Sequence, residues 1–240
     1  MIIGMRGHDF GRMEPEALAA AIRETGFRAT QLAFTKAFPQ PAAQYMTPEA
    51  LRAIREAFAA EGVALPVMGC YVSASDRDPE KLAAGEAAYA RLLGFVRSAV
   101  AAAEACGALV AIEPVAVHTL NTPELTQRLI ADVNHPRLRI ILDVANLVTP
   151  QTAAPGAQQE LLERCLACFG ERIAVLHVKD GVFNAEGQWE NRPLGQGVMD
   201  WARLLPRLRA HNDSLCALRE GVFPGMAEEE CRIMRRWAQD

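Results

Sequence analysis

The chain has 240 residues, half of them hydrophobic, and a formal net charge of −4 that is spread along the sequence. This length suits one α/β domain with a large buried core, and the lack of a Lys/Arg run argues against a dedicated nucleic-acid or anionic-membrane surface. No apolar stretch approaches the roughly 20 residues of a membrane span and the start lacks a signal-peptide pattern, so we expect a cytoplasmic protein.

Seven short apolar runs predict β-strands that are buried on both faces of a parallel sheet. The runs are 1–5, 29–34, 64–72, 108–115, 138–144, 173–178 and 215–220. Helical patterns lie between them, and two of these (14–26 and 47–62) end at a glycine. Thr47-Pro48 and Thr122-Pro123 each combine a preferred N-cap residue with a proline suited to the first helical position.

Strands that alternate with helices predict a single α/β domain over residues 1–240, a TIM-type (β/α) barrel. A complete barrel needs eight strands, and the sequence offers seven. Residues 79–107 have one helical pattern that contains Gly85 and Gly94 as potential breaks. We therefore predict that one β/α unit is missing between residues 72 and 108. A sheet edge left open by the gap could be covered by a second subunit, so a homo-oligomer is possible.

Six cysteines are expected to be free thiols in the reducing cytoplasm. Cys165 and Cys168 form a CxxC within a stretch whose apolar residues have helical spacing. No second CxxC or histidine pair accompanies them, so we predict that they pack in the core.

Four of the predicted strands end in a side chain that can bind a metal ion: Glu113, Asp143, His177 and Glu220. They are separated by 30, 34 and 43 residues, each close to one β/α repeat. Because the carboxyl ends of all barrel strands lie on one face, the four side chains are expected to converge. Three carboxylates and an imidazole suit one divalent ion such as Mn²⁺, Mg²⁺ or Co²⁺. Any one of them alone would more often be a helix cap or a structural residue; the series of four favours a site.

The segments that surround these residues resemble the xylose-isomerase-like barrel superfamily, in its sugar phosphate isomerase/epimerase branch. The resemblance rests on the segments AIEPV, ILDVANL, HVKD, PLGQG and LREG, and near the start on RGHDFG (6–11) and GFRATQLAF (26–34). It covers most of the chain. Members of this superfamily normally carry a further strand and helix between residues 69–71 and the strand of Glu113.

The resemblance implies a divalent-metal-dependent sugar or sugar-phosphate isomerase or epimerase. The metal ligands would be Glu113, Asp143, His177 and Glu220, and the two glutamates would also serve as catalytic acid and base through an enediolate. The partner of such a protein is a small sugar or polyol, with no role for nucleic acid or a membrane.

Five further residues are weaker candidates for substrate binding. His8 follows the first strand, His118 follows Glu113, Asn146 lies where several relatives have a histidine, Asp180 follows His177, and Arg192 lies in the loop ENRPLGQG and could meet a phosphate or carboxylate. Each has a plain structural alternative: a cap, a second-shell contact or a solvated side chain.

Three other functions compete with this prediction. An inosose-type dehydratase would use the same proton abstraction and then lose hydroxide. A phosphodiesterase that cleaves abasic DNA with three zinc ions is disfavoured, since the chain is acidic and position 146 is Asn. A degenerate barrel that binds a metal or metabolite without catalysis is the third.

Overall fold

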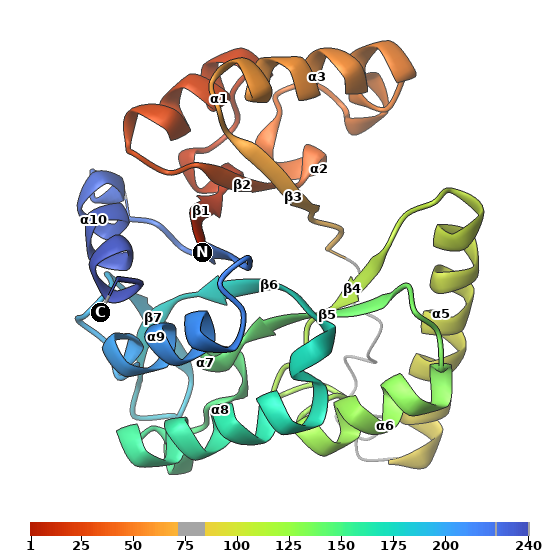
Figure 1. The fold of residues 1–240 in the computed structure, drawn as a ribbon, viewed down its shortest axis with the longest axis vertical. Coiled ribbons are helices and arrows are strands. Elements are labelled where there is room, and N and C mark those ends of the chain that lie inside the picture. Colours follow the sequence, from red (N-terminus) through yellow and green to blue (C-terminus); the bar gives the residue numbers. More distant parts are fainter. Residues whose placement is uncertain (72–84, 224, 240) are drawn as a thin grey trace. The chain divides into compact units, whose positions relative to one another are not determined.

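The computed structural model describes residues 1–71, 85–223 and 225–239 (Figure 1). The chain divides into two compact units, one of Met1–Tyr71 with His177–Asp240 and one of Val72–Leu176. Among the described residues, seven strands form a parallel curled sheet in the order β3-β2-β1-β9-β6-β5-β4, which agrees with the predicted number. They are β1 (Ile2–Arg6), β2 (Ala29–Leu32), β3 (Ala64–Met68), β4 (Val110–Ile112), β5 (Leu138–Asp143), β6 (Ile173–Val178) and β9 (Cys216–Arg219). That residues 1–240 form one domain stays a prediction.

Threonine caps begin two of the helices, as predicted. The side chain of Thr47 accepts a hydrogen bond from the Ala50 N–H at 3.2 Å before α3 (Pro48–Ala60), and Thr122 accepts one from Leu125 at 3.2 Å before α6 (Pro123–Val133). In both helices the capping oxygen satisfies a donor that the first turn leaves free.

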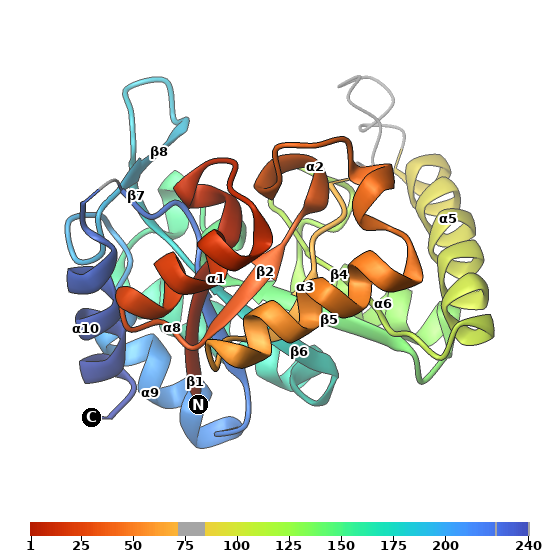
Figure 2. The same cartoon turned by 90° about the horizontal axis from the view of Figure 1, so that it is seen from above.

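In the first unit, β1 pairs in parallel with β2 on one side and with β9 on the other. The helices α1 (Pro15–Glu24) and α3 lie beside β2 (Figure 2), and α3 contacts β3. All four residues of β2 are buried, but β3 alternates between exposed and partly buried residues, and Met68 is 49% exposed. The prediction that every strand is buried on both faces is therefore wrong for β4, whose three residues are only partly buried, and most clearly wrong for β3. The physical reason is its place at the end of the sheet, where within the described residues it pairs only with β2.

In the second unit, β4 and β5 pair in parallel with Val110 opposite Leu138 and Ile112 opposite Ile140. The helices α5 (Glu86–Ala105), α6 and α8 (Pro155–Phe169) belong to this unit, and α6 and α8 lie side by side (Figure 1). Leu92, Val96 and Leu129 lie in the core that α5, α6 and β5 share.

The helix α5 is continuous through Gly94, so that glycine does not break it. Between β3 and β4 the structure describes residues 69–71 and 85–109, and these contain no strand, as the predicted loss of a β/α unit requires; residues 72–84 lie outside the described part. All six cysteines are free, and the CxxC lies in α8 with Cys165 buried, as expected of packing residues.

The remaining elements are short or connect the strands. They are α2 (Phe34–Ala37), α7 (Val144–Leu147), α9 (Trp201–His211), α10 (Ala227–Trp237), the 3₁₀ turns η1 (Gly7–Phe10), η2 (Ala42–Tyr45), η3 (Pro150–Thr152) and η4 (Gly170–Arg172), and the antiparallel hairpin of β7 (Asp180–Phe183) and β8 (Trp189–Arg192). This hairpin was not predicted. Among the described residues, no helix has both the length and the apolar character to cross a membrane.

Candidate metal centre

Each of the four predicted ligands stands at the carboxyl end of a strand. Glu113 directly follows β4 and Asp143 ends β5, both in the second unit. His177 lies one residue before the end of β6 and Glu220 directly follows β9, both in the first unit. Local strand formation by the apolar runs therefore delivers two potential ligands within each unit.

In the second unit, Asn146 joins the two acidic residues. Its side-chain Nδ2 donates to Glu113 Oε1 at 2.5 Å, and its backbone N–H donates to Asp143 Oδ1 at 3.2 Å. Asp143 thereby caps the short helix α7 and is fully buried. A carboxylate oxygen of Glu113 and one of Asp143 lie within 4.8 Å of each other, close enough to bind the same ion.

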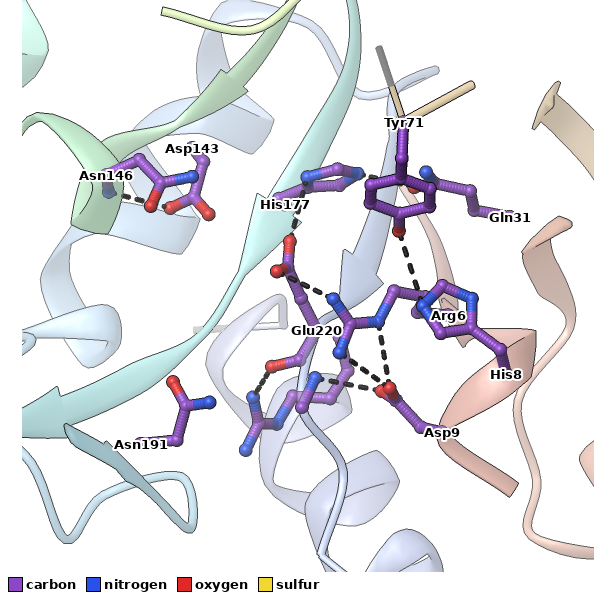
Figure 3. A network of polar contacts seen from close by, with 12 residues as sticks. Arg6, His8, Asp9, Gln31, Tyr71, Asp143, Asn146, His177, Asn191 and Glu220 are labelled. Carbon is purple, nitrogen blue, oxygen red and sulfur yellow. Dashed lines mark hydrogen bonds and ion pairs between the residues drawn. The ribbon is translucent and has the colours of Figure 1, made fainter. Parts of the chain in front are cut away.

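In the first unit, His177 lies between Gln31 and Glu220 (Figure 3). Its Nε2 is 2.7 Å from Gln31 Oε1, and its Nδ1 is 3.2 Å from Glu220 Oε2. An amide oxygen only accepts hydrogen bonds, so this contact places the proton on Nε2 and turns the Nδ1 lone pair toward the carboxylate. A lone pair and a carboxylate oxygen this close require a positive charge, either a second proton on the ring or a cation.

Glu220 also contacts Arg6, whose Nη1 donates to its Oε1 at 2.7 Å. The guanidinium is held in turn by Asp9, which accepts from Nε at 2.8 Å (Figure 3). The second oxygen of Asp9 accepts from the backbone N–H groups of Gly221 and Val222 at 2.8 and 3.0 Å. Asp9 therefore fixes both the arginine and the chain that follows Glu220.

A fully buried ion pair also holds the segment that contains Glu220. Arg219 donates to both carboxylate oxygens of Glu230 on α10, at 3.0 and 2.9 Å, and also to the backbone carbonyl of Glu220. Glu230 accepts a further bond from Leu194 N–H at 3.0 Å. Both charged side chains are fully buried. Through these hydrogen bonds the pair connects the Glu220 carbonyl to the loop around residue 194.

These contacts keep Glu220 ionised. Burial by itself would raise its pKa, but the neighbouring His177 ring and the positive charges of Lys179 and Arg6 outweigh that effect and lower the pKa. A carboxylate that stays charged at neutral pH is suited to bind a cation.

Asp180, a predicted substrate-binding residue, has a structural role. It is fully buried, and its two oxygens accept backbone N–H bonds from Gly181, Gly195, Gly197 and Met199 at 2.9–3.1 Å. A Cβ at Gly197 would collide with the Asp180 carboxylate, so the glycine permits this close wrapping. Asp180 shapes the 195–199 loop, and its direct contact with substrate stays a prediction.

The other candidates are dispersed. Arg192 is 41% exposed and pairs with Glu190 at 2.8 Å in the β7–β8 hairpin, and His118 is exposed in the loop after β4. His8 is partly buried beside Tyr71, whose hydroxyl is 3.4 Å from His8 Nε2. Asn146 contacts Glu113 and Asp143 as described. A role in substrate binding stays a prediction for all four.

Sequence reasoning missed three residues of the first unit that contact the predicted ligands or their partners: Arg6, Asp9 and Gln31. A signal for them was present, because Arg6 directly follows the first apolar run and Gln31 lies within the second. Such residues occupy strand ends on the face where barrel enzymes place their sites.

The model of the xylose isomerase-like TIM barrel family matches residues 75–237, more than half of the chain. The chain belongs to this family. Among curated proteins, none is similar enough in sequence to count as a match.

Several solved structures share the fold at low sequence identity. D-psicose 3-epimerase from Clostridium cellulolyticum H10, determined with D-tagatose, has a TM-score of 0.70 and 13% identity over 100% of this chain and 98% of its own. A probable 3-DHS dehydratase from Bacillus anthracis has a TM-score of 0.70 and 13% identity over 100% and 99%. A xylose isomerase-like TIM barrel protein from Mycobacterium smegmatis, in complex with magnesium, has a TM-score of 0.68 and 16% identity over 99% and 95%. The fold is therefore shared by a sugar epimerase, a probable dehydratase and a protein whose structure was determined in complex with magnesium.

Proposed function

We propose that this protein is a divalent-metal-dependent isomerase or epimerase of a sugar or sugar phosphate in the cytoplasm. One ion, Mn²⁺, Mg²⁺ or Co²⁺, would be held jointly by Glu113, Asp143, His177 and Glu220. The proposal requires the ligand pair of each unit to meet on the same ion.

The observation that carries the proposal is the contact between His177 Nδ1 and Glu220 Oε2 at 3.2 Å, with Nε2 held by Gln31. In this arrangement an acceptor behind the histidine, here the Gln31 amide oxygen, orients the ring so that its other nitrogen can bind a metal ion. The donor set of three carboxylates and an imidazole suits a hard-to-borderline divalent ion. The fully buried Asp143 adds to the argument, because a buried carboxylate is costly unless a positive charge or hydrogen-bond donors balance it.

A bound divalent ion supplies Lewis acidity, which polarises a substrate carbonyl and stabilises the negative charge that develops when the neighbouring C–H proton leaves. In our proposal Glu113 and Glu220 exchange protons with the substrate. One carboxylate removes the α-proton and the other returns a proton, to the opposite face of the same carbon for epimerisation or to the neighbouring carbon for isomerisation.

Neighbouring residues orient the two glutamates. Asn146 orients Glu113 through its amide, and Arg6 with Asp9 orients Glu220. The Arg6 guanidinium, beside the Glu220 carboxylate, is also placed to donate to a substrate oxygen on which negative charge develops.

A dehydratase is the second candidate, because one of the fold's solved members is a probable dehydratase. It would begin with the same proton abstraction and then expel hydroxide from the adjacent carbon. Product analysis separates the two, since only the dehydratase yields an enone or diketone and releases water.

The experiment is metal-dependent exchange of substrate C–H protons with D₂O, followed by NMR on a panel of ketoses and ketose phosphates. We expect exchange with the Mn²⁺-loaded protein and none after chelation. Glu160→Gln and Glu228→Gln, which change exposed acids of the second and first unit, should behave as wild type. Exchange that survives complete removal of metal would refute the mechanism, and no exchange with any ketose would favour a barrel without catalysis.

A further inference from the structure

A row of side chains leads from the surface of the first unit to Glu220. Lys36 in α2 holds its Nζ 3.5 Å from the centre of the Tyr71 ring. The Tyr71 hydroxyl is 3.4 Å from His8 Nε2, and the two rings meet edge to face at 5.5 Å between centroids. Tyr71 also interacts with Arg6, which contacts Glu220.

The row lies where substrate would be expected in a barrel. Lys36, Tyr71 and His8 follow β2, β3 and β1, and thus stand beyond the carboxyl ends of three strands of one unit. Barrel enzymes build their substrate sites from the loops at this end. Figure 3 shows Tyr71 and His8 on the same side of Glu220 as Arg6.

The charges of this row favour an anion. Lys36 is exposed, and contact with one aromatic face leaves its ammonium group further N–H donors. Burial and the charges of Arg6 and Lys36 lower the pKa of His8 to about 4, so the ring is neutral at physiological pH. The Lys36 ammonium and the Tyr71 hydroxyl can donate to the oxygens of a phosphate or carboxylate, while His8 Nε2, which contacts that hydroxyl, can donate to its oxygen and so orient it.

We propose that Lys36, Tyr71 and His8 bind an anionic group, a phosphate ester or a carboxylate, at the end of the sugar that is remote from the metal ligands. The inference rests on the proposed function, and it narrows the substrate class to anionic sugars. Arg192, the residue that the sequence suggested for this task, is instead paired with Glu190 in the exposed hairpin.

The test compares three probes with one carbon skeleton: D-fructose, D-fructose 6-phosphate and D-fructuronate. Their dissociation constants are measured by calorimetry on the Mn²⁺-loaded wild type and on Lys36→Met and Tyr71→Phe. Arg203→Met is the matched control, because it removes a positive charge from a side chain of α9 that is 66% exposed.

In the wild type we expect at least one anionic probe to bind about tenfold or more tightly than D-fructose, as charge-assisted hydrogen bonds allow. Lys36→Met should bring that ratio close to unity, Tyr71→Phe should reduce it in part, and Arg203→Met should leave it intact. Whether the phosphate or the uronate binds better identifies the source of the anion, and either result supports the inference.

Equal affinity for all three probes, absence of binding by all three, or a preference that persists in Lys36→Met would overturn the inference. Measurements of proton exchange distinguish a failure of this inference from a failure of the proposed function. Exchange with a neutral ketose but no anionic preference removes only the inference, whereas an anionic preference without exchange on any ketose removes only the isomerase.

Discussion

The two ligand pairs of the proposed metal site stand at equivalent strand ends but are held by different means. In the first unit, Glu220 contacts a cation, Arg6, which is itself fixed by Asp9. In the second unit, Glu113 contacts the neutral amide of Asn146. An arginine balances the charge of a carboxylate and thus competes with a metal ion, while an amide orients a carboxylate and leaves its charge available.

One ion pair of the first unit differs in burial from an ion pair of the second. Arg219 and Glu230 of the first unit are fully buried, and Arg164 and Glu124 of the second are each 54% exposed. In the first unit, buried charged residues therefore hold the candidate ligands in place, and the loss of one of these charges should cost stability. The second relies on caps and apolar packing, with its ion pairs at the surface.

The largest effect is expected from replacing either of the two glutamates. The comparison predicts that both replacements lower activity to the same degree. Glu113→Gln and Glu220→Gln should each lower metal-dependent proton exchange by about 10²–10⁴-fold, because each removes a group that transfers a proton. Exchange rates at saturating Mn²⁺ measure this. If one variant retained full activity, the two carboxylates would not share the chemistry.

The second prediction concerns stability. Glu230→Gln should lower the free energy of unfolding by about 3–5 kcal/mol, because it leaves Arg219 buried without its counter-charge. Arg164→Met, which breaks the exposed pair, should cost about 0–1 kcal/mol. Chemical denaturation of the metal-free proteins gives both values. Similar losses in both variants would show that burial does not distinguish the pairs.

The third prediction concerns the affinity for Mn²⁺, which should change in opposite directions when a residue is replaced in one unit or in the other. Asn146→Ala should weaken Mn²⁺ binding by about 10–100-fold, as loss of a second-shell contact does. Arg6→Met should tighten binding by about fivefold, because a positive charge worth roughly 1 kcal/mol against the ion has been removed. Calorimetric titration with Mn²⁺ checks both. Weaker binding in Arg6→Met would mean that the arginine acts mainly by orienting Glu220.

The last prediction concerns a pH dependence in the first unit. His8 titrates near 6.5 when unfolded and at about 4 when folded, so folding favours its neutral form. Its contribution to stability is complete above pH 6.5 and is lost as the pH falls from 6.5 to 4. The difference in unfolding free energy between wild type and His8→Gln should shrink over that window. A difference that is constant with pH would contradict the assignment.

Much of the fold could be predicted because it is encoded locally. Apolar runs bounded by polar residues mark the seven strands, and Thr47 and Thr122 mark two helix starts through capping bonds that span three residues. The ligand candidates were found for the same reason, since each lies at or next to the end of such a run. The exposed edge of β3 was missed because composition does not tell which strand lacks a neighbour.

The supporting contacts could not be predicted from local patterns. Arg6 and Glu220 are 214 residues apart, and His177 and Gln31 are 146 apart. Asp180 looked available for substrate, yet its oxygens are used by a loop whose path depends on the glycines at 195 and 197. Pairing between distant polar residues is decided by the tertiary fold.

The central claim is that ligands from both units bind the same ion, and a Mn²⁺ titration of the metal-free protein tests it most directly. We predict one ion per chain, with affinity reduced by about tenfold or more in both Asp143→Asn and His177→Gln, and with non-additive effects in the double variant, as expected of residues that share a partner. Two independent ions per chain, or wild-type affinity in either single variant, would contradict the shared site.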